Sequence, residues 1–133
     1  MSLPPLERIL LVDDEADIRQ VARLALEAVG GFRVRECASG LAAPKAIEEF
    51  APQLILMDMM MPGQDGVETL KVLRASGATS RIPVVFMTAK VQPQEVSAFR
   101  SLGALDVIAK PFDPMTLAQT VRRIWERQVQ FLP

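Results

Sequence analysis

The sequence predicts an α/β protein with a doubly wound, three-layer arrangement around a five-stranded parallel sheet. Short apolar runs alternate five times with segments that have the spacing of amphipathic helices. The run 54–57 is apolar at every position, as expected of a central parallel strand covered on both faces. Five strand–helix units in a chain of 133 residues fit an open doubly wound sheet better than an eightfold barrel.

The first strand–helix unit begins with the apolar run 8–12, which ends at Asp13 and Asp14. A helix is expected over 17–29, because apolar residues recur there every three or four positions, as on one helix face. The pair at 30–31 is Gly-Gly, which ends this helix because glycine readily takes the left-handed conformation of a C-terminal cap.

The second and third units follow the same pattern. Segment 32–37 alternates between apolar and polar residues and predicts a strand. A helix is expected over 41–50, with Pro44 near its first turn, where the missing N–H does least harm. A turn-rich loop over 61–66 then separates the third strand from a helix over 67–75.

The last two units complete the predicted sheet. Asp113 is the expected N-cap of the final helix, and Pro114 its first helical residue. Trp125 and Phe131, near the C-terminus, are expected to close the core. The expected elements are strands over 83–87 and 105–109 and helices over 93–102 and 115–129.

The composition excludes several classes of function. The chain is half hydrophobic and long enough for one domain over residues 1–133, with a core at about 7–129. Its 15 basic and 16 acidic residues include no basic run, so direct binding of nucleic acid or of a membrane is not expected. There is no histidine and one cysteine, Cys37, which excludes Ser-His-Asp triads, zinc sites of the usual kinds and an internal disulfide. Without a recognisable secretory signal or spanning segment, the chain is expected to be cytoplasmic.

Polar side chains gather at the carboxyl ends of the strands, where open α/β sheets bind ligands. They are Asp13 and Asp14 after the first strand, Asp58 after the third, Thr88 after the fourth and Lys110 after the fifth. Three carboxylates at one edge repel one another unless a cation neutralises them, and oxygen ligands suit Mg²⁺, Mn²⁺ or Ca²⁺. Lys110 and Thr88 would complete a clamp for a phosphoryl group. Asp58 ends the middle strand and is the expected nucleophile, since carboxylates form aspartyl phosphates.

These residues stand in motifs that resemble those of response regulator receiver domains. The motifs are Asp13-Asp14, the run 57–66, Thr88-Ala89 and Lys110-Pro111, and the resemblance extends over about residues 8–128. It implies a flavodoxin-like (βα)5 fold with strand order 2-1-3-4-5. It also implies a phosphoacceptor in a two-component or phosphorelay system, which is a signalling switch that catalyses its own phosphorylation and dephosphorylation.

The resemblance also assigns a role to each position. The implied metal is Mg²⁺, with Mn²⁺ as an alternative. The resemblance implies that Asp58 is the phosphoacceptor and a metal ligand. Asp14 and the backbone carbonyl of Met60 would also bind the metal, and Asp13 would reach it through water. Thr88, followed by Ala89, would supply the switch hydroxyl, Lys110 would pair with the phosphoryl group, and the peptide bond before Pro111 would be cis.

Two positions depart from the family pattern. Val107 stands where the last strand usually carries an aromatic residue, so we expect signal to pass through Thr88 and the loop after it. Met60 replaces the polar residues often found two positions after the phosphoacceptor. With Lys90 it borders the route of an attacking water, and we expect it to slow hydrolysis of the phosphoryl group.

Two other functions fit the sequence less well. A haloacid-dehalogenase-like phosphatase would need a second Asp two residues after the nucleophile, where this chain has Met60. A degenerate receiver that only binds a protein is disfavoured by the complete set of site residues. The implied phosphodonor is a histidine kinase or a histidine phosphotransfer protein. An unidentified output partner or domain would bind the face formed by the helix over 93–102, the last strand and the last helix, and a homodimer through this face is allowed.

Overall fold

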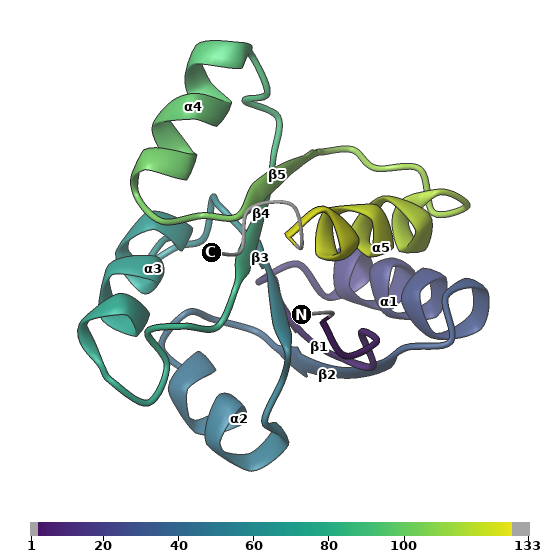
Figure 1. Cartoon of the computed structure of the whole chain (residues 1–133), viewed down its shortest axis with the longest axis horizontal. Helices are drawn as coiled ribbons and strands as arrows, with labels where there is room; N and C mark the ends of the chain where they lie inside the picture. Colours follow the sequence, from purple (N-terminus) through teal and green to yellow (C-terminus); the bar gives the residue numbers. More distant parts are fainter. Residues whose placement is uncertain (1–2, 129–133) are drawn as a thin grey trace.

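Five parallel strands form one sheet in the computed structural model, which describes residues 3–128 (Figure 1). The sheet order is β2-β1-β3-β4-β5, and each neighbouring pair is parallel, so the predicted fold class and strand order are confirmed. The strands are β1 (Arg8–Val12), β2 (Arg33–Cys37), β3 (Leu54–Asp58), β4 (Val84–Thr88) and β5 (Asp106–Ala109).

Helices cover both faces of this sheet. In Figure 1, α1 and α5 lie on one side of the strands, while α2 and α3 lie on the other. The helical elements are α1 (Ala16–Leu24), the π-helical turn η1 (Ala25–Val29), α2 (Ala43–Phe50), α3 (Gly66–Ala75), α4 (Pro93–Ser101) and α5 (Leu117–Arg127). No helix within residues 3–128 has the length and apolar character needed to cross a membrane.

The core consists of two hydrophobic layers, one on each face of the sheet. Successive strand residues point to opposite faces, so Ile9 and Leu11 pack with α1 and α5, while Leu10 and Val12 pack with α2 and α3. Burial on both faces explains why the central strand has no polar residue before Asp58. Asp58 is therefore the first polar side chain at the end of a fully buried strand.

The first helix differs from the single α-helix expected over 17–29. It changes at Ala25 into the π-helical turn η1, whose wider turn alters the spacing of side chains around the helix. Val29 was expected on the buried face and is exposed instead. Val21 is also exposed and lines the cavity at the strand ends. Gly31, with φ of 73°, supplies the left-handed residue that ends the helix.

The last helix begins two residues later than predicted, and its N-cap differs from the predicted one. The helix α5 begins at Leu117 with Thr116 as its N-cap, and Met115 is 72% exposed. Asp113 instead closes a turn before the helix, because its carboxylate accepts a hydrogen bond from the backbone N–H of Met115 at 2.9 Å. The other predicted limits within the described residues differ from the observed ones by at most two positions.

Trp125 closes one end of the core, as expected. Its ring is buried, and its indole N–H donates a hydrogen bond to the carbonyl oxygen of Pro4 at 2.9 Å. The expected end of the helix at residue 129 and the expected contribution of Phe131 lie outside the described residues.

Candidate functional site

The parallel register brings the predicted site residues to one edge of the sheet. Asp13 directly follows β1, Asp58 ends β3, Thr88 ends β4 and Lys110 directly follows β5. In the pairing of β3 with β4, Asp58 lies opposite Met87, so Thr88 stands one residue further along the neighbouring strand. Four strands, or the residues that directly follow them, therefore place these groups along the same edge of the sheet.

Lys110 is the electrostatic centre of this edge. Its ammonium nitrogen lies 3.2 Å from Oδ2 of Asp13, 3.2 Å from Oδ2 of Asp58 and 3.5 Å from Oε1 of Glu15. Burial opposes the charged form, but the carboxylates of Asp13 and Asp58 outweigh it and raise the pKa of Lys110. The lysine is therefore held as a cation against two buried carboxylates.

Asp58 is buried, with 2% of its surface exposed. Its Oδ1 accepts a hydrogen bond from the backbone N–H of Met60 at 3.3 Å. Its Oδ2 has no hydrogen-bond partner, because the contact with Lys110 has the distance of an ion pair without the angles of a hydrogen bond. Burial, and then the charge of Asp13, raise the pKa of Asp58, while Lys110 opposes this shift.

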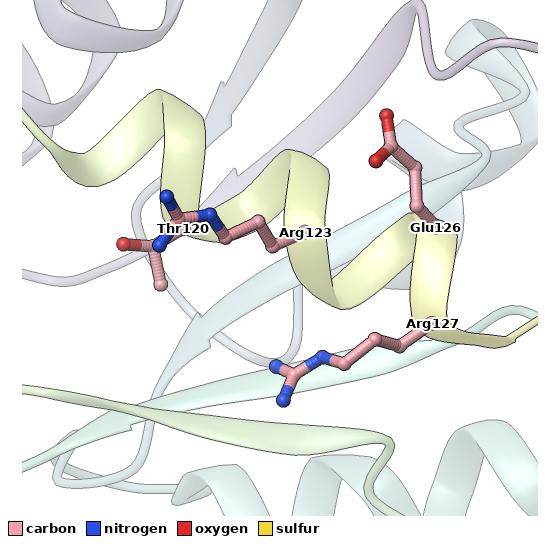
Figure 2. Close-up of a pocket in the computed structure, with 4 residues that line it drawn as sticks. All are labelled: Thr120, Arg123, Glu126 and Arg127. Carbon is pink, nitrogen blue, oxygen red and sulfur yellow. The ribbon is translucent and has the colours of Figure 1, made fainter.

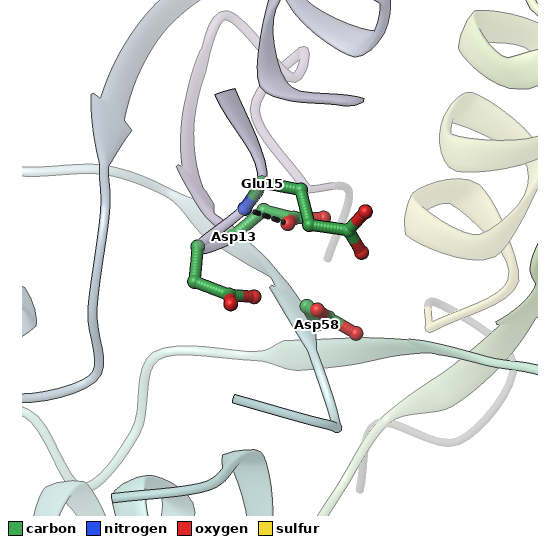
Figure 3. Close-up of side chains that lie close together, drawn as sticks. Asp13, Glu15 and Asp58 are labelled. Atoms are coloured by element: carbon green, nitrogen blue, oxygen red, sulfur yellow. Dashed lines mark hydrogen bonds between the residues drawn. The ribbon is translucent and has the colours of Figure 1, made fainter. Parts of the chain in front are cut away.

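Asp13 is fixed by contacts on every side. Its side chain has no exposed surface, and Oδ1 accepts a hydrogen bond from the backbone N–H of Glu15 at 2.8 Å (Figure 3). Its own backbone N–H donates to the carbonyl oxygen of Cys37, and its carbonyl oxygen accepts from the guanidinium of Arg19 at 2.7 Å. This network aims the Asp13 carboxylate at Lys110.

Four acidic side chains, including that of Asp58, form a cluster at this edge of the sheet. Asp13, Asp14, Glu15 and Asp58 each offer a carboxylate oxygen, and these atoms lie within 4.8 Å of one another. Figure 3 shows Asp13 and Glu15 after β1, with Asp58 close to them at the end of β3. A donor set of oxygen atoms only, with a buried oxygen that no protein group satisfies, fits a hard divalent cation.

Glu15 was not among the predicted site residues. It immediately follows Asp13 and Asp14 at the end of the first strand, and that position was the signal available in the sequence. Its side chain reaches both the acidic cluster and Lys110.

Thr88 and Lys110 border a cavity of about 460 Å³ that opens beside Asp58. Thr88 is buried, and its hydroxyl oxygen accepts a hydrogen bond from the backbone N–H of Lys90 at 3.0 Å. The peptide bond between Lys110 and Pro111 is cis. The lining residues are Glu15, Ile18, Val21, Asp58, Met60, Thr88, Ala89, Lys110, Pro111 and Phe112.

The four methionines around Asp58 differ in burial. Met57, Met59 and Met61 are buried in the core on the α2–α3 face of the sheet, but Met60 is 69% exposed at the cavity. Val107 is half-buried and lines a different depression, between β5 and α5.

Gly66 is a further residue that shapes the site. A Cβ atom on Gly66 would lie 2.8 Å from Cα of Met59 and 2.9 Å from the backbone oxygen of Asp58. Only glycine lets α3 begin this close to the end of β3. From the sequence, Gly66 was expected only as the last residue of the turn-rich loop over 61–66, because this contact depends on how two elements pack.

A second cavity of about 530 Å³ lies on the outer surface of α5 and contains no residue of the strand-end site. Thr120, Arg123, Glu126 and Arg127 line it, all from this one helix (Figure 2). It is open and highly charged, and we assign it no chemistry.

Comparison with known proteins identifies the family. Residues 9–122 match the response regulator receiver domain, and the chain belongs to this family. It is 38% identical over 116 residues to the DNA-binding response regulator MtrA of Mycobacterium tuberculosis, which covers 87% of this chain and 49% of MtrA. It is 36% identical over 119 residues to the phosphate regulon transcriptional regulatory protein PhoB of Pseudomonas aeruginosa, covering 90% and 52% of the two chains.

The solved structure of the chemotaxis response regulator CheY4 of Vibrio cholerae has the same fold. It matches with a TM-score of 0.81 and 28% identity, over 90% of this chain and 98% of that chain. The chain spans about half the length of the curated relatives it matches. It is therefore a receiver domain of the response regulators, the signalling switches of two-component systems.

Proposed function

We propose that this receiver domain accepts a phosphoryl group on Asp58, in a Mg²⁺-dependent transfer from a phosphohistidine of a histidine kinase or a histidine phosphotransfer protein. The observation that carries the proposal is the environment of Oδ2 of Asp58. This oxygen is buried, has no hydrogen-bond partner and lies 3.2 Å from the ammonium of Lys110 beside an open cavity. A nucleophile needs such an oxygen, charged and not already engaged by a donor.

In the proposed transfer, an oxygen of Asp58 forms a bond to phosphorus while the P–N bond of the donor breaks. The donor imidazole keeps the electron pair of that bond and takes a proton from water. Lys110 stabilises the charge on the phosphoryl oxygens, and the Thr88 hydroxyl, which only accepts a hydrogen bond here, has its proton free to donate to them.

Asp13, Asp14 and Asp58, with the backbone carbonyl of Met60, would hold Mg²⁺, and Mn²⁺ would serve as a substitute. When bound, the cation would neutralise charge on the phosphoryl oxygens and the carboxylates. The chain itself contributes the positions of these oxygens. Asp13 is fixed by its hydrogen bonds, and Asp58 is fixed by its place at the end of a buried strand.

The proposed output surface is the face formed by α4, β5 and α5. The helix α4 has no fully buried residue, so it is the least firmly anchored of the described α-helices. Asp106 of β5 pairs with Arg100 of α4 at 2.9 Å and with Arg127 of α5 at 3.2 Å, which links the three elements. Movement of the loop of Thr88 and Ala89 would reach α4 directly, and an output domain, a partner protein or a second copy would sense it.

The test is incubation of the purified chain with acetyl phosphate and Mg²⁺, followed by intact mass spectrometry. We expect a gain of one phosphoryl group that is lost in Asp58→Asn and after chelation of the metal. Repeated turnover of a phosphate ester would support a phosphatase instead. No reaction with the donor would support a module that only binds a protein.

A further inference from the structure

Glu15 and two buried aspartates share the ammonium of Lys110. The ammonium nitrogen lies 3.2 Å from an oxygen of Asp13 and 3.5 Å from Oε1 of Glu15, with a hydrogen bond to each. The Asp13 side chain has no exposed surface, whereas the Glu15 side chain is 60% exposed. Glu15 is therefore the solvent-exposed partner of the ammonium, and Asp13 and Asp58 are its buried partners.

Glu15 also borders the cavity that a phosphoryl group on Asp58 would enter. It lines the same cavity as Asp58 and Thr88, and its carboxylate belongs to the group of oxygens within 4.8 Å of one another. Lys110 is the one cationic residue among the described residues that line this cavity. A phosphoryl group would bring about two negative charges and strong acceptors into a space whose single ammonium is already shared among three carboxylates.

We propose that Glu15 is a positioning residue that restrains Lys110 in the unphosphorylated protein and sets the balance between metal binding and phosphoryl transfer. This inference rests on the proposed function of Asp58. The Glu15 carboxylate competes with the arriving phosphoryl group for Lys110 and repels the anionic donor, which slows transfer. The same charge adds to the acidic cluster and strengthens binding of a divalent cation.

The inference predicts two effects of opposite sign for Glu15→Gln, which keeps the size of the side chain and removes its charge. Mg²⁺ binding to the unphosphorylated protein should weaken, and phosphorylation by acetyl phosphate at saturating Mg²⁺ should become faster. Each change should be about three- to tenfold, the effect of one unit charge acting over about 4 Å in a water-like medium. In this reaction the new bond joins phosphorus to an oxygen of Asp58, and acetate leaves with the electron pair of the broken P–O bond.

Asp17→Asn is the matched control. Asp17 is exposed in the first turn of α1, two residues from Glu15, and it is not part of the acidic cluster. Both variants lose one acidic charge from the same segment. Asp17→Asn should therefore leave the affinity for Mg²⁺ and the phosphorylation rate within about twofold of the wild-type values, because its charge is screened by solvent.

Mg²⁺ affinity is measured by isothermal titration calorimetry without phosphodonor, and the rate is measured by intact mass spectrometry at low and at high NaCl. Slower or unchanged phosphorylation in Glu15→Gln relative to Asp17→Asn would overturn the inference. A rate gain that is equally large in high salt would also overturn it, because the effect of an exposed charge must shrink with screening. If the wild-type chain gains no phosphoryl group on Asp58, the proposed function fails, while the calorimetric comparison still tests the effect of Glu15 on the metal.

Discussion

The ammonium nitrogen of Lys110 and Oδ2 of Asp58 lie 3.2 Å apart at the carboxyl edge of the sheet and form an ion pair without a hydrogen bond. The ammonium balances the buried charge of Asp58 but leaves Oδ2 without a donor. A fully hydrogen-bonded carboxylate would be more stable and a poorer nucleophile. The pair therefore combines charge compensation with an oxygen that remains available for chemistry.

Removing the ammonium should damage both stability and transfer. We expect Lys110→Gln to reduce phosphorylation by acetyl phosphate by about tenfold or more, because one stabilising charge on the phosphoryl oxygens is lost. Without metal the variant should also unfold more easily, by about 1–3 kcal/mol, since Asp13 and Asp58 then lack their buried counter-charge. Urea titrations with and without Mg²⁺ measure this, and Mg²⁺ should restore part of the loss. Lys71→Gln, an exposed lysine on α3, is the control and should change neither quantity.

The raised pKa of Asp58 predicts how stability depends on pH. Burial raises this pKa above the ordinary value of 3.8, so the native state binds the proton more tightly than the unfolded state does. The stabilisation that this provides is present at low pH and is lost as pH rises through the folded-state pKa. Asp58→Asn mimics the neutral group at every pH. With a chelator present, we expect the two proteins to have similar free energies of unfolding at a pH below 3.8, and the variant to be the more stable of the two at pH 7. Denaturant titrations across this range would contradict the assignment if the difference shrank as pH increased.

A methyl group on Gly66 should disturb the site through the backbone. Gly66→Ala would place Cβ 2.8 Å from Cα of Met59, and neither backbone can move without shifting the end of β3. We expect a loss of about 1–3 kcal/mol in stability together with slower phosphorylation of Asp58. Gly77→Ala serves as the control, because nothing lies within 4 Å of its added Cβ. Equal stability of the two variants in thermal unfolding would show that α3 can move away from the strand end.

Met60 is expected to lengthen the lifetime of the phosphoryl group. Its exposed apolar side chain borders the cavity and offers no hydrogen bond to orient an attacking water. Met60→Asn supplies a donor and an acceptor at that point, so hydrolysis should become faster by about threefold or more. The decay of phosphorylated protein after removal of the donor measures this rate, with the exposed Met115→Asn as control. Identical decay rates of the phosphorylated Met60→Asn variant and the phosphorylated wild type would contradict this prediction.

The strands and the polar residues that end them could be predicted because their causes are local. A run such as Leu54 to Met57 has no polar position, so it must be buried on both faces, and Asp58 must then mark the strand end. Helix limits were less predictable where two local structures compete. Asp113 can cap a helix or close a turn, and in the structure its carboxylate accepts from Met115 in a turn that precedes the start of α5 at Leu117.

By itself, the sequence determined the number of strands, their positions along the chain and the identity of the chemical groups at their ends, because hydrophobic periodicity and strand-end position are properties of adjacent residues. Only the tertiary structure decided that Glu15 shares Lys110, that Gly66 must lack a side chain and that one oxygen of Asp58 is left without a donor. Each of these is a contact between groups from different elements, and its distance depends on how the sheet and helices pack.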